Sequence, residues 1–154
     1  MWLDLQVNRP MQAASTQFVL DVALQCRQRQ VVLFGPSGAG KSLTLKAVAG
    51  LLRPWHGHVR LQGQVLFDSA AGVNLPPQQR RLGYVFQDYA LFPHLSVRQN
   101  VAFGLHRGWF NPRRAVRNDA VERWLQAFRI DHVADLLPSQ VSGGQRQRTA
   151  LARA

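Results

Sequence analysis

Residues 35–42 combine residue types and a spacing that together can bind phosphate. The stretch reads GPSGAGKS, a glycine, four residues, then Gly-Lys-Ser. The glycines allow a tight loop whose backbone N–H groups converge on phosphate oxygens, and a following helix N-terminus adds partial positive charge. Lys41 can reach the β- and γ-phosphates, and the Ser42 hydroxyl can ligate Mg²⁺. The pattern predicts a nucleoside-triphosphate site; the alternative is a Gly-rich turn with an idle lysine.

The segments on either side of this loop fit the same interpretation. Residues 31–34 form a short, wholly apolar run, which predicts a strand buried on both faces. Residues 42–52 predict an amphipathic helix that Arg53-Pro54 ends. Its apolar face is expected to carry Leu45, Val48, Ala49 and Leu52. The loop is therefore expected between a buried strand and a helix.

Apolar patterns predict the other strands. Residues that alternate between apolar and polar predict an N-terminal hairpin around residues 10–16. Two further short strands are expected around Gly63, and a buried strand before Gln87. The strands are expected at residues 3–7, 18–24, 58–61, 65–67 and 81–86.

From residue 97 onward the pattern is helical. A helix is predicted over 115–129, with Val121 and Leu125 widening an apolar stripe. The stripe itself is expected to carry Val116, Ala120, Trp124 and Phe128. Asp131 is predicted to cap a short helix that Pro138 ends.

Composition limits the class of protein. The 154 residues carry 46% hydrophobic residues and a formal net charge of +11. The single cysteine, Cys26, cannot form an internal disulfide, and we find neither a signal peptide nor an apolar run long enough to span a membrane. The arginines are scattered, without the aromatic–basic pattern of RNA binding. We therefore expect a cytoplasmic chain and no nucleic-acid partner.

Two further stretches can do chemistry. Gln87 follows the predicted strand at 81–86, and ligands of α/β sheets bind at strand ends. This glutamine could ligate Mg²⁺ or hold an attacking water, or it could simply be solvated. At residues 142–145, Ser-Gly-Gly-Gln predicts a capped helix start with free amides, a second anion site. Good helix formers then continue to the last residue.

These three stretches, in this order, resemble the ATP-binding subunit of ATP-binding-cassette (ABC) transporters. Residues 35–42 resemble its Walker A loop, Gln87 its Q-loop glutamine, and VSGGQ at 141–145 its LSGGQ signature. The resemblance implies an α/β P-loop NTPase fold of the ABC ATPase type, with an N-terminal antiparallel β subdomain and an inserted α-helical subdomain. Residues 1–88 would form the nucleotide-binding core, and 89–154 the helical subdomain with the start of the signature helix.

The resemblance also implies what each site residue does. Lys41 and Gln87 would be catalytic, and Ser42 and Gln87 would ligate Mg²⁺. The ATP phosphates would be held by Gly35, Pro36, Ser37, Gly38, Ala39, Gly40, Lys41, Ser42 and Leu43. The signature residues would contact the ATP of a second subunit in a head-to-tail dimer; they are Ser142, Gly143, Gly144 and Gln145. The family often has an adenine-stacking aromatic where this chain has Met11 or Gln12.

The family's catalytic Asp-Glu pair, D-loop and switch histidine would come after Ala154. We therefore expect a fragment truncated before the Walker B strand, an ATPase as the intact protein but inactive alone. Residues 89–95 are either a core segment or a groove for a transmembrane permease subunit.

Residues 65–88 are most similar to the ATPases of molybdate importers, which implies uptake of a small oxyanion at the cytoplasmic face of a bacterial-type membrane. The alternatives are a soluble non-transport ABC ATPase, a P-loop kinase, or a degenerate chain that binds ATP without turnover.

Overall fold

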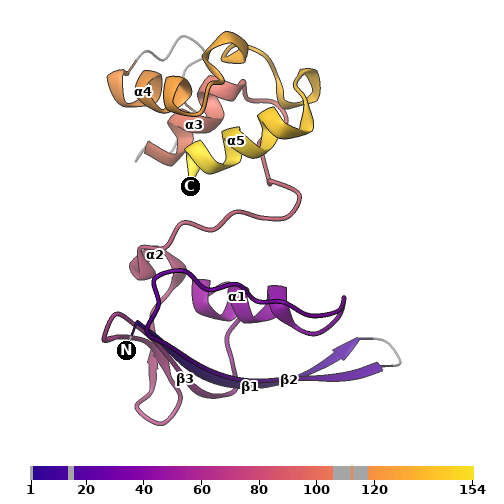
Figure 1. The fold of residues 1–154 in the computed structure, drawn as a ribbon, viewed down its shortest axis with the longest axis vertical. Helices are drawn as coiled ribbons and strands as arrows, with labels where there is room; N and C mark the ends of the chain where they lie inside the picture. Colours follow the sequence, from indigo (N-terminus) through magenta and orange to yellow (C-terminus); the bar gives the residue numbers. More distant parts are fainter. Residues whose placement is uncertain (1, 14–15, 106–111, 113–117) are drawn as a thin grey trace. The chain divides into compact units, whose positions relative to one another are not determined.

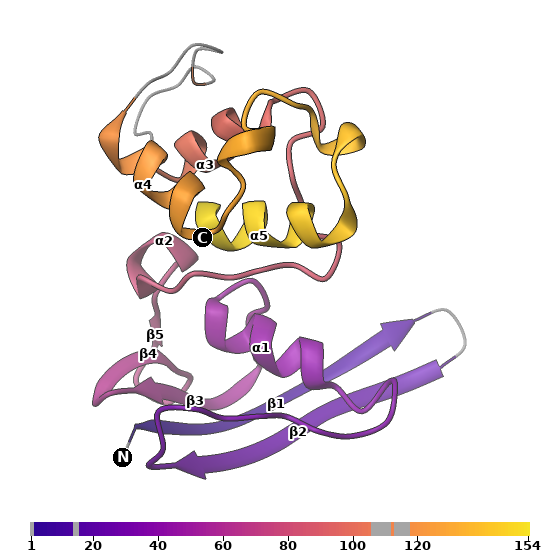
Figure 2. The same cartoon turned by 45° about the horizontal axis from the view of Figure 1, so that its top comes forward.

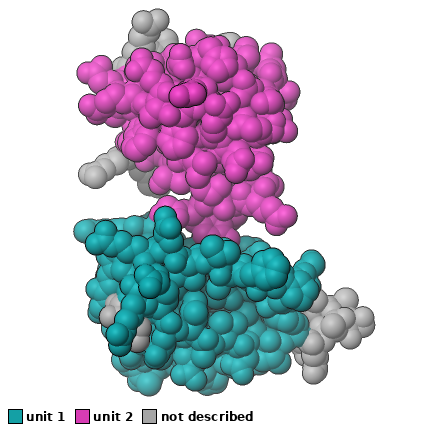
Figure 3. Space-filling view, viewed as in Figure 1, with its two compact units in different colours: residues 1–82 teal, residues 83–154 magenta. Residues whose placement is uncertain are grey.

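The chain folds into two compact units. The computed structural model describes residues 2–13, 16–105, 112 and 118–154. Unit 1 comprises Met1–Leu82 and unit 2 comprises Gly83–Ala154. Figure 1 traces the chain through both units, and Figure 3 colours unit 1 teal and unit 2 magenta.

Unit 1 contains an antiparallel sheet. The strands are β1 (Leu3–Ala13), β2 (Thr16–Cys26), β3 (His56–Leu61), β4 (Gln64–Asp68) and β5 (Val73–Asn74), in the spatial order β2-β1-β3-β4-β5. The predicted N-terminal hairpin is confirmed, since Leu3 pairs with Cys26 and Ala13 with Thr16. The pair of strands around Gly63 is also confirmed. β1 continues through Pro10, so the hairpin is longer than the alternating residues predict.

One face of this sheet carries the core of unit 1. Alternate side chains of a strand point to the same face, and Leu5 and Val7 of β1 are accordingly buried with Leu20 and Val59 of the neighbouring strands. The helix α1 (Lys41–Ala49) lies over this sheet in Figure 2 and contributes Val48 to the same cluster. The short helix α2 (Pro77–Arg80) follows β5.

Two strand predictions are wrong. Residues 31–34 and 81–86 are not strands, and the first run is exposed, with Val32 at 87% and Phe34 at 99%. An apolar run becomes a buried strand only where neighbouring strands accept its backbone hydrogen bonds. Within the described residues, the sheet uses only β1 to β5, and neither run pairs with it.

The predicted helix after the phosphate loop exists, and most of its predicted apolar face lies inward. Ala49 is buried, and Val48 and Leu52 pack against the core of unit 1, whereas Leu45 is half exposed. It also ends earlier than predicted, because Gly50 adopts a left-handed φ of 81° and its amide bonds back to the last turn. The helix terminator is therefore glycine rather than Arg53-Pro54.

Unit 2 is helical, as the sequence predicts from residue 97 onward. Its helices are α3 (Val97–Leu105), α4 (Asp119–Ala127) and α5 (Gly143–Arg153), with 3₁₀ turns at Asp131–Val133 and Pro138–Gln140. Their apolar faces meet in one cluster of buried residues. The cluster comprises Val97, Val101, Ala102, Val121, Leu125, Ile130, Val133, Ala134 and Val141.

Several details of unit 2 differ from the predictions. Val121 and Leu125 form the buried face of α4, whereas Trp124 is 46% exposed, so the predicted stripe lies at the edge of the core. Residues 115–117, with Val116, lie outside the described residues. Asp131 is the first residue of a 3₁₀ turn rather than a cap, and Pro138 begins a turn rather than ending a helix. Proline fits there because its fixed φ suits the first helical position.

No helix in the described part of the chain is both long enough and apolar enough to cross a bilayer.

Candidate functional site

The phosphate loop leads directly into the N-terminus of α1. Gly38 and Gly40 adopt left-handed φ values of 83° and 86°, which turn the chain sharply before Lys41. The first hydrogen bond of the helix runs from the Thr44 amide to the Gly40 carbonyl at 2.8 Å. The amides of Lys41, Ser42 and Leu43 consequently have no partner within the helix. Unsatisfied amides at a helix N-terminus can bind an anion.

Lys41 folds back over this loop. Its Nζ donates to the Gly35 carbonyl at 2.7 Å and to the Pro36 carbonyl at 2.6 Å. No ion pair among the described residues includes Lys41, so no carboxylate there neutralises its charge. The half-buried ammonium is thus held at the loop by neutral acceptors, which a phosphate could replace.

β2 packs against the base of the loop. A Cβ atom on Gly40 would lie 2.8 Å from Leu20 Cδ1 and 3.3 Å from Phe18 Cζ, so the backbone of the loop passes directly over these two side chains. Phe18 belongs to the core of unit 1, as its alternation in sequence predicts. The loop therefore packs on side chains of the hairpin, and Gly40 allows this close approach because it has no Cβ.

The other end of α1 is held by Arg80, which is not one of the predicted site residues. Its side chain is 3% exposed, and Nη1 donates to the Ala47 and Val48 carbonyls, each at 2.8 Å. Nε also donates to the Leu75 carbonyl at 2.8 Å. Burial lowers the pKa of this guanidinium below its usual value. No periodic pattern marks Arg80, because its acceptors are carbonyls, and every residue has one.

Gln87 lies at the start of unit 2, in an irregular segment rather than at the end of a strand as predicted. Its side chain is exposed. In the following segment, Leu95 is buried and Pro93 is exposed, so residues 89–95 are neither wholly core nor wholly surface. The role predicted for Gln87 stays a prediction.

The signature residues form a capped helix start. Ser142 Oγ accepts from the Gln145 amide at 3.3 Å, and Gln145 Oε1 accepts from the Ser142 amide at 2.8 Å. This reciprocal pair is a capping box, which fixes the first turn of α5. The predicted Ser142 cap is confirmed. Gly143 and Gly144 lie in that first turn, where amides have no intrahelical acceptor.

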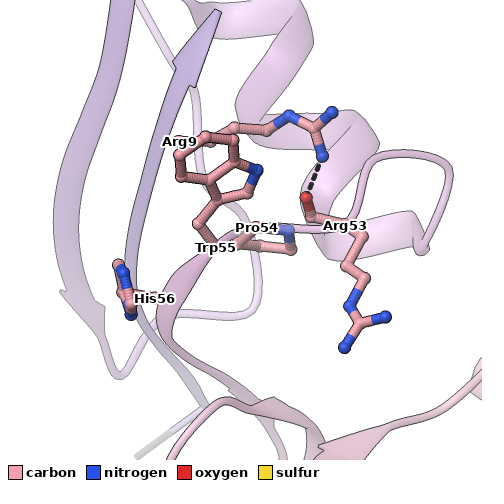
Figure 4. Close-up of a pocket in the computed structure, with 5 residues that line it drawn as sticks. All are labelled: Arg9, Arg53, Pro54, Trp55 and His56. Atoms are coloured by element: carbon pink, nitrogen blue, oxygen red, sulfur yellow. Dashed lines mark hydrogen bonds between the residues drawn. The ribbon is translucent and has the colours of Figure 1, made fainter.

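A separate pocket lies in unit 1, beside the loop between α1 and β3. Its volume is about 440 Å³, and it is lined by Arg9, Arg53, Pro54, Trp55 and His56. Figure 4 shows the Arg9 side chain reaching across it to donate to the Arg53 carbonyl. None of the predicted site residues lines this pocket.

The predicted site residues are thus divided between the two units. Unit 1 holds the whole phosphate loop, with Lys41 and Ser42, and unit 2 holds Gln87 and the signature residues. Within the described residues, no three His, Cys, Asp or Glu side chains come together as a metal site.

Comparison with solved structures shows the same fold in ABC cassettes. The ATP-binding cassette MJ0796, solved as a dimer in a post-hydrolysis state bound to ADP and Pi, matches with a TM-score of 0.73 and 27% identity. The match covers 98% of this chain and 68% of that one. The α/β ABC ATPase fold implied by the sequence is confirmed.

Sequence relatives are longer proteins. The molybdenum import ATP-binding protein ModC of Paramagnetospirillum magneticum is 43% identical over 99% of this chain, and that of Mycobacterium tuberculosis is 49% identical over 88%. The molybdate/tungstate import ATP-binding protein WtpC of Archaeoglobus fulgidus is 44% identical over 89%. This chain spans 40%, 37% and 53% of those three proteins, respectively. The model of the ABC transporter family matches residues 19–154, and the chain belongs to that family.

Proposed function

We propose that this chain is part of the ATP-binding and hydrolysing subunit of an ABC importer that takes up a small oxyanion, with molybdate as the expected cargo. The observation that carries the proposal is the phosphate loop: the Lys41 ammonium contacts only neutral carbonyls among the described residues, and it stands in the first turn of α1, whose first amides have no partner within the helix. The names of the relatives support the cargo. In this assignment residues 1–88 serve as the nucleotide-binding core, and 89–154 as the helical part with the signature.

ATP binding follows from the chemistry of the loop. The β- and γ-phosphates replace the two carbonyls that Lys41 Nζ contacts, and the amides of Lys41, Ser42 and Leu43 donate to their oxygens. Such preorganised donors stabilise the charge that shifts between phosphate oxygens during phosphoryl transfer.

Mg²⁺ fits the donors at the start of α1. Ser42 is exposed in the first helical turn, beside the phosphate-binding amides, and its hydroxyl is the hard oxygen ligand that Mg²⁺ prefers. Gln87 is the second ligand that we assign. When bound, the ion neutralises phosphate charge.

The signature residues act on a second nucleotide. Ser142 and the amides of Gly143 and Gly144 present another anion-binding helix start, and we assign them to the γ-phosphate of an ATP held by a partner subunit. Two ATP molecules then hold two subunits head to tail. This arrangement makes ATP binding and subunit association one coupled event.

We assign the membrane permease to residues 89–95, where Leu91 and Phe92 are partly exposed. The subunit would then work at the cytoplasmic face of a bacterial-type membrane.

Two substitutions in the full-length protein test this proposal. Lys41→Ala is expected to abolish useful ATP binding, because it removes the only side-chain cation of the loop. Ser142→Arg is expected to spare ATP binding and block turnover, because the arginine obstructs the trans site. The measurements are titration with a fluorescent ATP analogue and release of phosphate. Equal loss of ATP affinity in both variants would contradict the trans assignment, and binding without turnover in the unchanged protein would indicate a degenerate ATPase.

A further inference from the structure

The backbone after Gln87 is held in an unfavourable conformation. Tyr89 and Ala90 have φ values of 64° and 43°, the left-handed region that side chains with a Cβ rarely adopt. Two consecutive residues of this kind persist only where surrounding contacts impose the conformation. The contacts on this segment therefore indicate what determines its shape.

Arg153, in the last turn of α5, supplies two of these contacts. Its Nη1 donates to the Ala90 carbonyl at 2.6 Å and its Nη2 to the Tyr89 carbonyl at 3.1 Å. The guanidinium carbon also lies 5.5 Å from the centre of the Phe92 ring, within the range of a cation–π contact. One planar fork thus contacts both left-handed residues and the aromatic ring that follows them.

Asn100 of α3 holds the same segment from another side. This side chain is fully buried, and its Oδ1 accepts from the Phe92 amide at 2.9 Å while Nδ2 donates to the Phe92 carbonyl at 3.2 Å. The Phe92 ring also packs on Phe103, with 4.5 Å between ring centres. Phe92 is therefore fixed to α3, whereas Tyr89 and Ala90 are fixed to α5.

α3 and α5 are themselves in close contact at this point. A Cβ on Gly104 would lie 2.1 Å from the Arg153 carbonyl oxygen, so the two backbones approach as closely as glycine allows. Burial lowers the pKa of the Arg153 guanidinium, which indicates a partly desolvated position. The carboxyl end of α5 consequently has little freedom to move without moving residues 89–92.

We propose that Arg153 is a positioning residue that makes the segment after Gln87 follow the signature helix. α5 has 11 residues, which is about 16 Å of rigid helix, with Ser142 capping one end and Arg153 in the last turn. A displacement of the capped end by a nucleotide passes along the helix to the Tyr89 and Ala90 carbonyls. The inference rests on the proposed function, because it takes the amides at the start of α5 as the nucleotide contact.

Hydrogen–deuterium exchange of the full-length protein, with and without Mg²⁺ and the non-hydrolysable analogue AMP-PNP, tests the proposed function and the role of Arg153 separately. In the unchanged protein, the analogue is expected to slow exchange at residues 143–145 and to change it at 89–95. In Arg153→Ala, we expect the effect at 143–145 to remain and the effect at 89–95 to shrink at least about fivefold. Arg153→Lys should give an intermediate response, because an ammonium lacks the planar fork.

Arg148→Ala is the matched control. Arg148 lies on the same helix and donates to the Phe128, Arg129 and Gly144 carbonyls at 3.3, 3.4 and 3.4 Å, with no hydrogen bond to residues 89–92 among those of the described residues. Its response at 89–95 should match that of the unchanged protein. A full response at 89–95 in either Arg153 variant, or equal losses in Arg148→Ala, overturns the inference alone. No effect at 143–145 in the unchanged protein overturns the proposed function, and the inference with it.

Discussion

Arg80 closes the C-terminal end of the helix that begins at the phosphate loop, its Nη1 donating to the Ala47 carbonyl at 2.8 Å. The last carbonyls of a helix have no donor within the helix and carry partial negative charge. A buried guanidinium both donates hydrogen bonds to these carbonyls and balances their charge. The side chain also fills the space beside Gly50, where a Cβ would lie 2.6 Å from Arg80 Nε. Arg80 and Gly50 together fix where α1 ends.

Replacing Arg80 by alanine should destabilise unit 1. We expect a loss of about 2–4 kcal/mol, because several buried carbonyls lose a charged donor at once. Urea unfolding followed by circular dichroism measures this loss. The control is Arg81→Ala, an exposed neighbour that should change the free energy of unfolding by less than about 0.5 kcal/mol. Equal effects in the two variants would show that the guanidinium contacts do not stabilise the helix end.

Gly40 should be the least replaceable glycine of the phosphate loop. Gly40→Ala meets both an unfavourable φ of 86° and a contact of 2.8 Å with the buried Leu20. Gly63→Ala has a similar φ of 81° but meets nothing within 4 Å. We expect about 1–2 kcal/mol of destabilisation for Gly63→Ala from the backbone alone, and more for Gly40→Ala.

The binding of a fluorescent ATP analogue distinguishes these two glycines further. It should be lost only in Gly40→Ala, since the turn at Gly63 lies between β3 and β4. Comparable affinities in the two variants would contradict the close packing of the loop on β2.

The fold could be predicted from sequence where a pattern reports on local contacts. The hairpin follows from its alternating residues, and the helical character of unit 2 follows from the pattern after residue 97, because each element buries a side-chain face against neighbours in its own unit. The runs at 31–34 and 81–86 are as apolar as buried strands, yet neither pairs with the sheet of the described residues. A strand forms only beside a neighbouring strand that pairs with its backbone, and the residues of the run do not show whether such a neighbour exists.

In the candidate site, too, local features could be predicted from sequence and contacts between distant residues could not. The loop at 35–42 and the Ser142 cap are recognisable because glycine, lysine and serine at fixed spacing have specific local consequences. The contacts of Arg80 and Arg153 are not predictable in this way, since both side chains donate to backbone carbonyls distant in sequence. Such contacts depend on the folded arrangement of the acceptors and leave no pattern in the residues themselves.

Asp68 should make unit 1 sensitive to acid. A hydrogen bond from the Ala71 amide at 3.1 Å is the main reason that the pKa of Asp68 lies below its usual value, and Arg60 contributes as well. A lowered folded pKa gives stability that is present above the unfolded value of about 3.9 and is lost as pH falls through the folded value. Asp68→Asn keeps an oxygen acceptor but no charge.

We therefore expect Asp68→Asn to be less stable than the unchanged protein at pH 6 and to approach it at pH values below about 4. The urea midpoint measured at several pH values shows this convergence. Asp21→Asn, which removes an exposed carboxylate from β2, is the control for the loss of one negative charge at pH 6. A constant offset between Asp68→Asn and the unchanged protein at all pH values would contradict the pKa shift.

Ser142 is expected both to cap α5 and to contact the γ-phosphate of a second ATP, and different substitutions can separate these two roles. Ser142→Ala removes the cap of α5 and should cost about 1 kcal/mol of stability. Ser142→Asp keeps a capping oxygen and adds a negative charge that suits a helix N-terminus, so stability should be retained. If the proposed trans contact is correct, the same carboxylate repels the γ-phosphate and prevents association in AMP-PNP and Mg²⁺, which light scattering measures.

The cap of α4 provides the control for Ser142. Asn118 accepts from the Ala120 amide at 2.8 Å, so Asn118→Ala should cost about 1 kcal/mol as well, yet leave association unchanged. This comparison separates loss of a cap from loss of a phosphate contact, because both alanine variants weaken a helix start in unit 2. An Ser142→Asp variant that associates like the unchanged protein would mean that Ser142 caps its helix and does not face a phosphate.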